Sequence, residues 1–273
     1  MDYNIILKNN LVLKGLITSP GENIRAMILF VHGLGEHIQR YSEWADMLYK
    51  EGIGFTGVDL PGHGRSDGSR GNIKSFAVTN EMIDILYQSI QKTFPGVPVF
   101  LYGHSLGGGI VLYYLLTRKP EIKGAIVTSP WLKLSFEPDK FKVAMASVVK
   151  SILPGLTQPS GLVVDHISHD KKEVDKYAAD PLIHDRISVS LFHSTMDAAR
   201  YSLAHASELN VPLLLMHGSD DMICSPEASR EFASRTPMAE LKIWEGGYHE
   251  LHNETFRKEV FDYLIKWINM RLK

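Results

Sequence analysis

Short apolar segments of strand length alternate with segments of helical periodicity, and this alternation restricts the fold more than any other feature of the chain. The strand-sized runs lie at 26–31, 53–58, 97–102, 125–128, 211–216 and 241–244. Apolar residues at helical spacing stand between them, at 41–51, 78–93, 106–117, 226–235 and 255–271. Strands that alternate with helices form parallel βαβ units, whose sheet is covered by helices on both faces. The chain is therefore predicted to have an α/β fold with a mostly parallel central sheet, preceded by a hairpin over residues 3–17.

The alternation stops between residues 130 and 206. This stretch begins with an apolar helical segment at 141–153, continues with a turn-rich and then a polar sequence, and ends with a helix-like segment at about 189–203. No part of it resembles a buried strand. An insertion of this size between two strands is typical of a lid over the carboxyl edge of the sheet. We therefore expect a core of residues 1–129 and 207–273, with a helical lid at 130–206.

The charge and the apolar content exclude several classes of protein. The 273 residues carry a net charge of −2 with no run of like charges, which gives neither a footprint for nucleic acid nor a polybasic membrane anchor. The longest apolar runs are of strand length, and the N-terminus lacks the basic and apolar regions of a secretory signal. We expect a cytoplasmic protein, or one that is peripheral at membrane surfaces, and the sequence indicates no oligomeric state.

The run at 97–102 leads into Gly103-His104-Ser105-Leu106-Gly107, after which a helical pattern begins. This is G-x-S-x-G between a strand and a helix, the context in which the motif marks a nucleophilic serine. The turn is so tight that a Cβ at either glycine would collide with its neighbours, and the helix N-terminus adds positive potential. We therefore predict Ser105 as the nucleophile and a structural role for His104; the alternative is a glycine-rich helix entry with an incidental serine.

A serine nucleophile needs a histidine base, and the base needs an acid that fixes its tautomer. In this kind of site the acid and then the histidine follow the serine along the chain, each after a strand. Asp220 and Asp221 follow the run at 211–216, and their position alone does not separate them. His249 follows the run at 241–244 and is preferred to His252, because it comes just after the glycine pair that ends the strand.

The first of the parallel strands ends in His32-Gly33-Leu34-Gly35-Glu36. Glycines at this crossover let the backbone approach a substrate carbonyl and direct an N–H at the developing oxyanion. We predict that the backbone amides of Leu34 and Leu106 form the oxyanion hole.

With these residues assigned, the chain from about residue 25 to its end resembles the monoacylglycerol lipase family of α/β-hydrolases. The resemblance lies in HGLGEHIQRY at 32–41, DLPGHGRSDGSRG at 59–71, GHSLGG at 103–108, KKEVDKYAADPLI at 171–183, GSDDMIC at 218–224 and GGYHELHNE at 246–254. It implies an α/β-hydrolase fold and a Ser-His-Asp triad with Asp221 as the acid and His249 as the base. Such a triad needs no metal and no cofactor.

The same resemblance implies an apolar tunnel for one acyl chain and a polar end for glycerol, formed by Glu36, Arg40, Tyr177 and His252. The chain departs from the family at Leu34, where relatives often carry a smaller residue, and at Ser225, where an acidic residue is common. Lysophospholipases and general carboxylesterases share the HGxGEH and GHSxGG segments, so the resemblance supports the reaction more than the headgroup. The expected substrate is a fatty-acid ester such as a monoacylglycerol, and the apolar segment at 141–153 either packs on the core, lines the tunnel or contacts a lipid surface.

Two other functions fit parts of the sequence. An aminopeptidase of this fold would use a carboxylate such as that of Glu36 to hold the α-amine of its substrate, and a non-catalytic binding protein would not need a complete triad. The segment 165–170 (DHISHD) looks like a metal cluster but lacks a third strong ligand, so we expect a solvated loop. Residues 62–66 lack the P-loop lysine and indicate a structural turn. Cys224 is expected to be a small buried residue, with a reactive thiol as the alternative.

Overall fold

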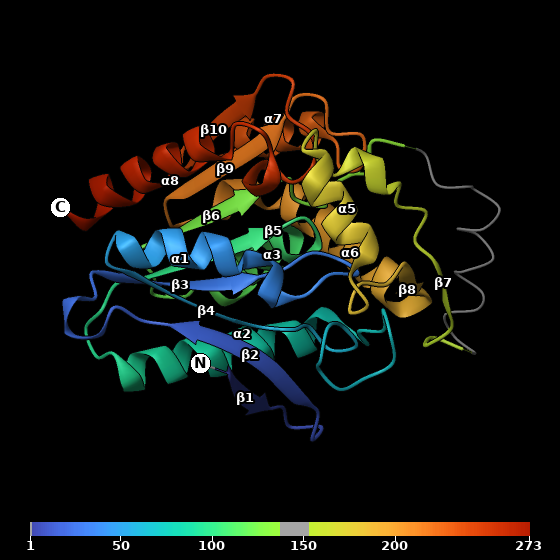
Figure 1. The fold of residues 1–273 in the computed structure, drawn as a ribbon, viewed down its shortest axis with the longest axis horizontal. Coiled ribbons are helices and arrows are strands. Elements are labelled where there is room, and N and C mark those ends of the chain that lie inside the picture. The colour runs from blue at the N-terminus through green and yellow to red at the C-terminus, as the bar shows by residue number, and fades with distance from the viewer. Residues whose placement is uncertain (1, 137–152) are drawn as a thin grey trace.

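The computed structural model describes residues 2–136 and 153–273, in which a sheet of eight strands has the order β1-β2-β4-β3-β5-β6-β9-β10. The first two strands form an antiparallel hairpin, β2 pairs antiparallel with β4, and all other neighbours in this sheet are parallel. The predicted α/β fold with a mostly parallel sheet is confirmed (Figure 1). The strands are β1 (Asp2–Ile6), β2 (Val12–Thr18), β3 (Ala26–Val31), β4 (Ile53–Val58), β5 (Val99–His104), β6 (Gly124–Thr128), β9 (Leu213–Gly218) and β10 (Ala239–Trp244).

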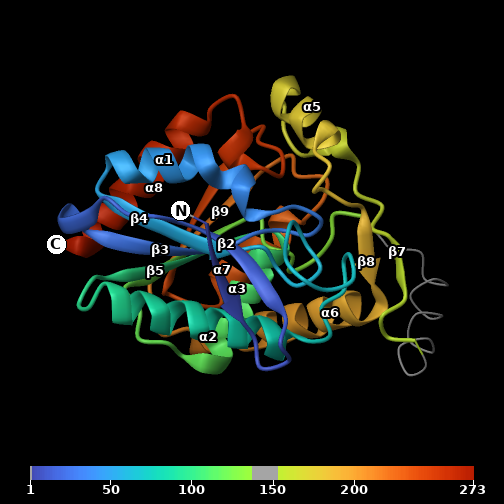
Figure 2. The ribbon, with the colours of Figure 1, turned by 60° about the horizontal axis from the view of Figure 1, so that its bottom comes forward.

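The sheet lies between two layers of helices, which Figure 2 shows above and below it. One face carries α1 (Ser42–Lys50) and α8 (Arg257–Leu272); the other carries α2 (Phe76–Thr93), α3 (Leu106–Arg118), α6 (Val189–Ala204) and α7 (Pro226–Ser234). Alternate side chains of β3 serve the two layers: Leu29 packs with the second group of helices and Phe30 with the first. Both faces of such a strand are buried, which explains the unbroken apolar runs in the sequence.

The chain between β6 and β9 adds no strand to this sheet within the residues that the structure describes. Its last helix, α6, was predicted and packs against α3 and α2, so it belongs to the layered body. A short antiparallel pair, β7 (Thr157–Pro159) and β8 (Arg186–Ser188), and the helix α5 (Lys171–Ala179) were not predicted. The predicted helical segment at 141–153 lies outside the described residues, apart from Leu153.

From the sequence, the segment of α5 was interpreted only as polar and no helix was predicted there; the structure shows one. Asp170 caps its N-terminus by accepting a hydrogen bond from the backbone N–H of Lys172 at 3.1 Å. Only Val174 and Tyr177 are buried on this helix, so its apolar face is too narrow to give a periodic signal. Among the described residues, no helix combines the length and the apolar character needed to cross a membrane.

Candidate active site

Ser105 stands at the turn between β5 and α3, in a strained backbone conformation with φ of 55°. A left-handed φ is unfavourable for a serine and is held here by close packing on both sides. A Cβ on Gly103 would lie 2.4 Å from the carbonyl oxygen of Gly107, and a Cβ on Gly107 would lie 2.0 Å from that of Val31. The turn therefore requires glycine at both flanking positions, as the G-x-S-x-G pattern indicated.

Asp221 and His249 form a short hydrogen bond next to this turn. Nδ1 of His249 donates to Oδ2 of Asp221 at 2.7 Å, and both side chains are almost fully buried. The other carboxylate oxygen, Oδ1, accepts from the backbone N–H groups of Ile223 at 2.8 Å and Cys224 at 2.9 Å. All of these contacts hold the carboxylate in one orientation and direct Nε2 of His249 away from Asp221.

The electrostatics of the pair suit an acid that remains ionised. Burial alone would raise the pKa of Asp221, but the attraction of His249 and the hydrogen bonds from His217 and His249 lower it below its usual range. Burial alone would lower the pKa of His249, and the charge of Asp221 outweighs it, so the pKa of His249 is raised. The imidazole is therefore a stronger base than a free histidine, with its Nδ1 proton fixed by Asp221.

The two residues that competed for these roles lie elsewhere. Asp220 is exposed, and its carboxylate accepts a hydrogen bond from the hydroxyl of Ser219 at 2.6 Å. The ring of His252 packs against Tyr41, with ring centroids 4.6 Å apart, and neither of its nitrogens has a hydrogen-bond partner. The geometry thus brings Asp221 and His249 together.

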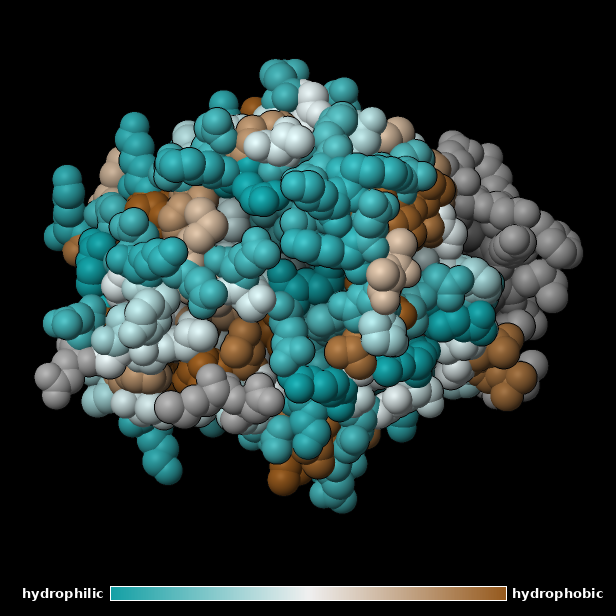
Figure 3. All heavy atoms as spheres, in the orientation of Figure 1, coloured by the Kyte–Doolittle hydropathy of each residue, from teal (hydrophilic) through white to brown (hydrophobic). Residues whose placement is uncertain are grey.

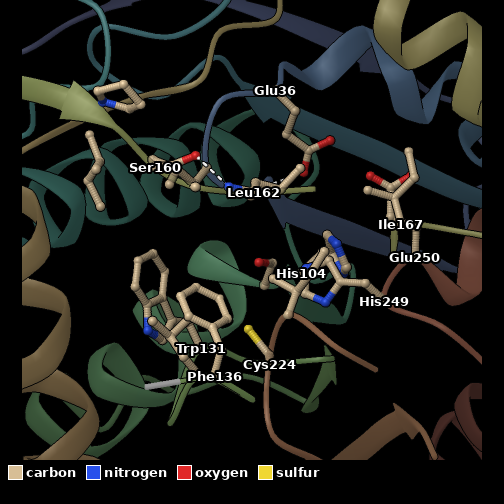
Figure 4. Close-up of a pocket in the computed structure, with 18 of the residues that line it drawn as sticks. Glu36, His104, Trp131, Phe136, Ser160, Leu162, Ile167, Cys224, His249 and Glu250 are labelled. Carbon is tan, nitrogen blue, oxygen red and sulfur yellow. Dashed lines mark hydrogen bonds between the residues drawn. The ribbon is translucent and has the colours of Figure 1, made fainter. Parts of the chain in front are cut away.

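A cavity of about 380 Å³ lies over Ser105 and His249. Figure 4 shows His104 and His249 on one side of it, with Trp131 and Phe136 on the other and the sulfur of Cys224 between them. Most of the remaining wall is apolar, formed by Leu34, Leu134, Leu162, Ile167, Ile187, Phe192 and Ile223. The cavity therefore combines one reactive polar corner with a long apolar wall.

Cys224 contacts Ser105, and its thiol is not activated. Its thiol is hydrogen-bonded to Ser105, and burial together with the charge of Asp221 raises the pKa of the thiol well above its ordinary value. The sulfur is buried and stays protonated at neutral pH, so the geometry favours the expected role of a small buried side chain.

The loop after β3 holds the peptide that joins Gly33 to Leu34. The backbone N–H of Leu60 donates to Nε2 of His32 at 2.8 Å, so Nδ1 carries the proton and donates to the carbonyl of Gly33 at 2.8 Å. Burial lowers the pKa of His32 to about 3, which keeps this neutral tautomer. Because C=O and N–H point in opposite directions across a trans peptide, the N–H of Leu34 is directed away from His32. Leu106, the first residue of α3, has an N–H with no acceptor inside the helix.

The residues implied for the polar end of the substrate divide into two pairs. Glu36 and Tyr177 line the cavity over Ser105, whereas Arg40 and His252 line a second pocket of about 590 Å³, which Tyr177 also borders. Arg40 is held away from the cavity over Ser105 because two buried carboxylates bind its guanidinium. Its guanidinium donates to Glu36 at 2.6 Å and to both oxygens of Glu250 at 2.7 Å.

Two residues of the site were not singled out from the sequence. Glu250 lines the cavity next to His249, and Arg40 outweighs burial to lower the pKa of its carboxyl to about 2. His217 donates to Asp221 from inside β9. The only sequence signal was position: Glu250 directly follows His249, and His217 comes after the apolar run at 211–216, four residues before Asp221.

The structure gives the local contacts of the two motifs that were interpreted as structural. His169 pairs with Glu254 at 3.0 Å, Asp165 is bound by Lys171, and no group of three or more potential ligands could hold a metal ion in the described part of the chain. Gly62 has a φ of 73°, and a Cβ there would lie 2.2 Å from the carbonyl oxygen of Ser69. Residues 62–66 are therefore a tight structural turn.

Comparison with known proteins gives consistent matches over nearly the whole chain. The family model Hydrolase_4, described as serine aminopeptidase S33, matches residues 22–256. Monoglyceride lipase of Homo sapiens is 34% identical over 259 residues, which cover 92% of this chain and 85% of that protein. The crystal structure of the monoacylglycerol lipase of Paleococcus ferrophilus matches with a TM-score of 0.87 and 34% identity, over 95% of this chain and 99% of that one. An uncharacterized abhydrolase domain-containing protein of Dictyostelium discoideum is also 34% identical, and the match spans 91% of this chain but only 27% of that protein.

Proposed function

The chain belongs to the monoacylglycerol lipase family of α/β-hydrolases, and we propose that it cleaves monoacylglycerol to a fatty acid and glycerol with Ser105, His249 and Asp221 as its catalytic triad. Membership of this family makes it a carboxylic ester hydrolase. The observation that carries the proposal is the position of His249, which is bound to buried Asp221 on one side and lines the cavity of Ser105 on the other.

In the proposed mechanism, the acyl group is transferred twice. His249 accepts the proton of the Ser105 hydroxyl as its oxygen attacks the ester carbonyl, and then returns that proton to the departing alcohol. Water is activated by His249 in the same way and releases the fatty acid from Ser105. Asp221 stabilises the imidazolium that forms in each half of the reaction. The amides of Leu34 and Leu106 bind the oxyanion, and each such donor typically contributes about 10²–10³ in rate.

The apolar wall of the cavity supports an acyl chain as the acid part of the ester. Trp131, Phe136 and Phe192 contribute rings to this wall. Burial of an acyl chain gains about 0.8 kcal/mol per methylene, so two further methylenes inside the cavity strengthen binding roughly tenfold. The polar corner near Glu36 and Tyr177 accommodates the alcohol part, and glycerol offers hydroxyl groups for it.

We further propose that the 130–206 insertion forms a lid that contacts lipid surfaces, except for α6, which packs in the layered body. Apolar side chains of this segment are 43–58% exposed, namely Phe136, Leu153, Leu156 and Val163. Phe136 also lines the cavity, which links the exposed apolar side chains to the binding site. Figure 3 shows apolar side chains reaching the surface at the end of the molecule that carries β7 and β8 in Figure 1. Exposed apolar side chains, one of which also lines the proposed ester-binding cavity, suit transient contact with a lipid surface.

Three contacts of Glu36 argue against peptide hydrolysis, which the family model's description leaves open. An aminopeptidase needs a carboxylate with free oxygens for the substrate's α-amine. Glu36 is already engaged: Oε1 accepts from the backbone N–H of Gly33 at 2.5 Å and from the hydroxyl of Tyr41 at 2.8 Å, and Oε2 accepts from Arg40, whose positive charge offsets that of the carboxylate. Oε2 can still accept a hydrogen bond from a neutral hydroxyl, but the carboxylate has no unbalanced charge for an α-ammonium group. A non-catalytic binding protein is disfavoured by the complete acid–base pair.

The proposal is tested by labelling and by substrate comparison. Ser105→Ala should lose fluorophosphonate labelling and ester hydrolysis while it keeps the thermal unfolding of the wild type. Retained activity in this variant would refute the assigned nucleophile. The headgroup is tested by kcat/KM on monoacylglycerol and on lysophospholipid with the same acyl chain, and a preference for lysophospholipid would replace the first substrate by the second.

A further inference from the structure

A second histidine, His217, contacts Asp221, the acid of the proposed triad. His217 is the fifth residue of β9 and is fully buried. Its Nε2 lies 3.0 Å from Oδ2 of Asp221, the same oxygen that accepts from His249. The other ring nitrogen, Nδ1, lies 2.8 Å from the hydroxyl of Ser229 on α7. The ring thus connects the acid to a helix behind the sheet.

The hydrogen on Nε2 of His217 follows from its partners. Besides Oδ2 of Asp221, this nitrogen faces the carbonyl oxygen of Cys224 at 3.0 Å. An ionised carboxylate and a carbonyl can only accept hydrogen bonds, so Nε2 must be the donor to both. Ser229 then meets Nδ1, and its hydroxyl can serve as donor or acceptor.

We propose that His217 is a positioning residue for catalysis: its Nε2–H fixes Asp221 in the orientation that meets His249 and takes a share of the negative charge on the shared oxygen. The proposal rests on the proposed function, because it assigns His217 a role through Asp221. Oδ1 of Asp221 is already held by two backbone amides, so His217 supplies the remaining fixed contact on the oxygen that faces the base. The histidine itself does not touch the reacting atoms.

This arrangement has a consequence for the pH dependence of the reaction. The titratable groups around His249 are Asp221 from the loop after β9, His104 from β5, Glu250 and His252 from the segment that follows it, and Glu36 from the loop after β3. Without the donor from His217, the full charge of Oδ2 would act on His249 and raise its pKa further. Because the base must be neutral to accept a proton, the acid limb of the profile of kcat/KM would move to higher pH.

Two substitutions of similar size separate this role from simple packing. In His217→Gln the side-chain amide reaches the place of Nε2 and can still donate to Asp221. In His217→Asn the amide reaches only the place of Nδ1, so the contact with Ser229 is kept and the donor to Asp221 is lost. Wild type and both variants would be compared with a soluble short-chain ester, and each rate would be divided by the active-site concentration from fluorophosphonate titration.

For the Asn variant we expect the acid limb to rise by about 0.5–1 pH unit. Its kcat should fall at least about tenfold with little change in KM, because a misplaced base slows the reaction without weakening binding. The Gln variant should remain close to wild type in both measurements. If the acid limb of the kcat/KM profile stays at the wild-type pH in both variants, the proposal is overturned. A residue that only packs would lower the stability of the protein without shifting this profile.

A measurement on the wild type covers the case in which the Asn variant does not fold. With ¹⁵N-labelled histidine, the imidazole shifts of His217, assigned by their loss in the Gln variant, report which nitrogen carries a hydrogen. A protonated Nε2 supports the proposal, and an Nε2 without hydrogen overturns it. If the wild type shows no ester hydrolysis that depends on Ser105, the proposed function is wrong. If the wild type shows this hydrolysis but the pH profile of His217→Asn is unchanged, only the role of His217 is wrong.

Discussion

Replacing Arg40 by methionine should destabilise the protein severely, and the loss should grow with pH. The guanidinium makes three short contacts with Glu36 and Glu250, and the side chains of all three residues are at most 9% exposed. Removal of one partner from such a buried cluster leaves uncompensated charge, which typically costs about 3–5 kcal/mol. For a protein of this size each kcal/mol lowers Tm by about 2–4 °C, so the expected decrease at neutral pH is roughly 6–20 °C.

The pH dependence follows from Glu250. With Arg40 present, the pKa of Glu250 is lowered from 4.5 to about 2, so the ion pair stabilises the fold fully above pH 4.5 and this stability is lost as the pH falls toward 2. In Arg40→Met, burial is the main remaining influence and raises the pKa above 4.5. A carboxyl with a raised pKa in the folded protein loses stability as the pH rises, so the difference in Tm from wild type should be smallest at acidic pH.

Thermal unfolding by circular dichroism at several pH values would measure this difference. Arg230→Met is the matched control, because Arg230 pairs with Glu227 at the surface, where the two side chains are 45% and 80% exposed. Such a pair typically contributes about 0–1 kcal/mol, so its removal should change Tm little at any pH. A decrease for Arg40→Met no larger than that of the control, or one that is constant with pH, would refute the reasoning.

Three further outcomes are expected. Asp221→Asn should lower kcat by about 10⁴, because the base then takes the wrong tautomer, whereas exposed Asp220→Asn should leave it nearly unchanged; equal losses would contradict the assignment of the acid. Gly107→Ala should prevent native folding or lower Tm strongly, because its Cβ would stand 2.0 Å from a backbone oxygen of β3, and a native Tm would contradict the packing. With 4-nitrophenyl esters, kcat/KM should rise from acetate to medium-length acyl chains as the cavity wall is covered, and a steady fall beyond acetate would rule out an acyl-binding cavity.

The sequence predicted those parts of the fold that are encoded locally. β3 was predicted with its observed bounds, because six consecutive buried residues leave an apolar run that ends at a His-Gly turn. The Ser105 turn was equally recognisable, since the glycines on both sides are demanded by contacts that any residue with a Cβ would break. Helix α5 could not be predicted from an apolar period, because most of its side chains face solvent and its formation depends on the cap at Asp170 and on packing against the body.

The division of the polar residues between two pockets could not be predicted either. The resemblance grouped Arg40 with Glu36, and the two side chains are hydrogen-bonded. The guanidinium, however, is also held by Glu250, which lies 210 residues further along the chain. Likewise, the role of His217 depends on which way Asp221 points within its loop. Sequence motifs gave the residue types, whereas the partners of each charged group required tertiary structure.

The buried cluster of Arg40, Glu36 and Glu250 connects three segments on which the proposed reaction depends. Through Glu36 it reaches the backbone of Gly33 in the loop after β3, and its other carboxylate belongs to Glu250, the chain neighbour of the proposed base His249. The backbone N–H of Glu250 donates to the carbonyl of Ile167 at 2.7 Å, and the guanidinium lies 4.7 Å from the ring centroid of Tyr177, so the cluster also contacts the 130–206 segment. Movement of Ile167 or Tyr177 away from the cavity would break contacts of the residues that hold the loop after β3 and the loop of His249. We therefore expect the packing of Ile167 and Tyr177 and the order of the proposed catalytic loops to stabilise each other, because Arg40 and Glu250 take part in both.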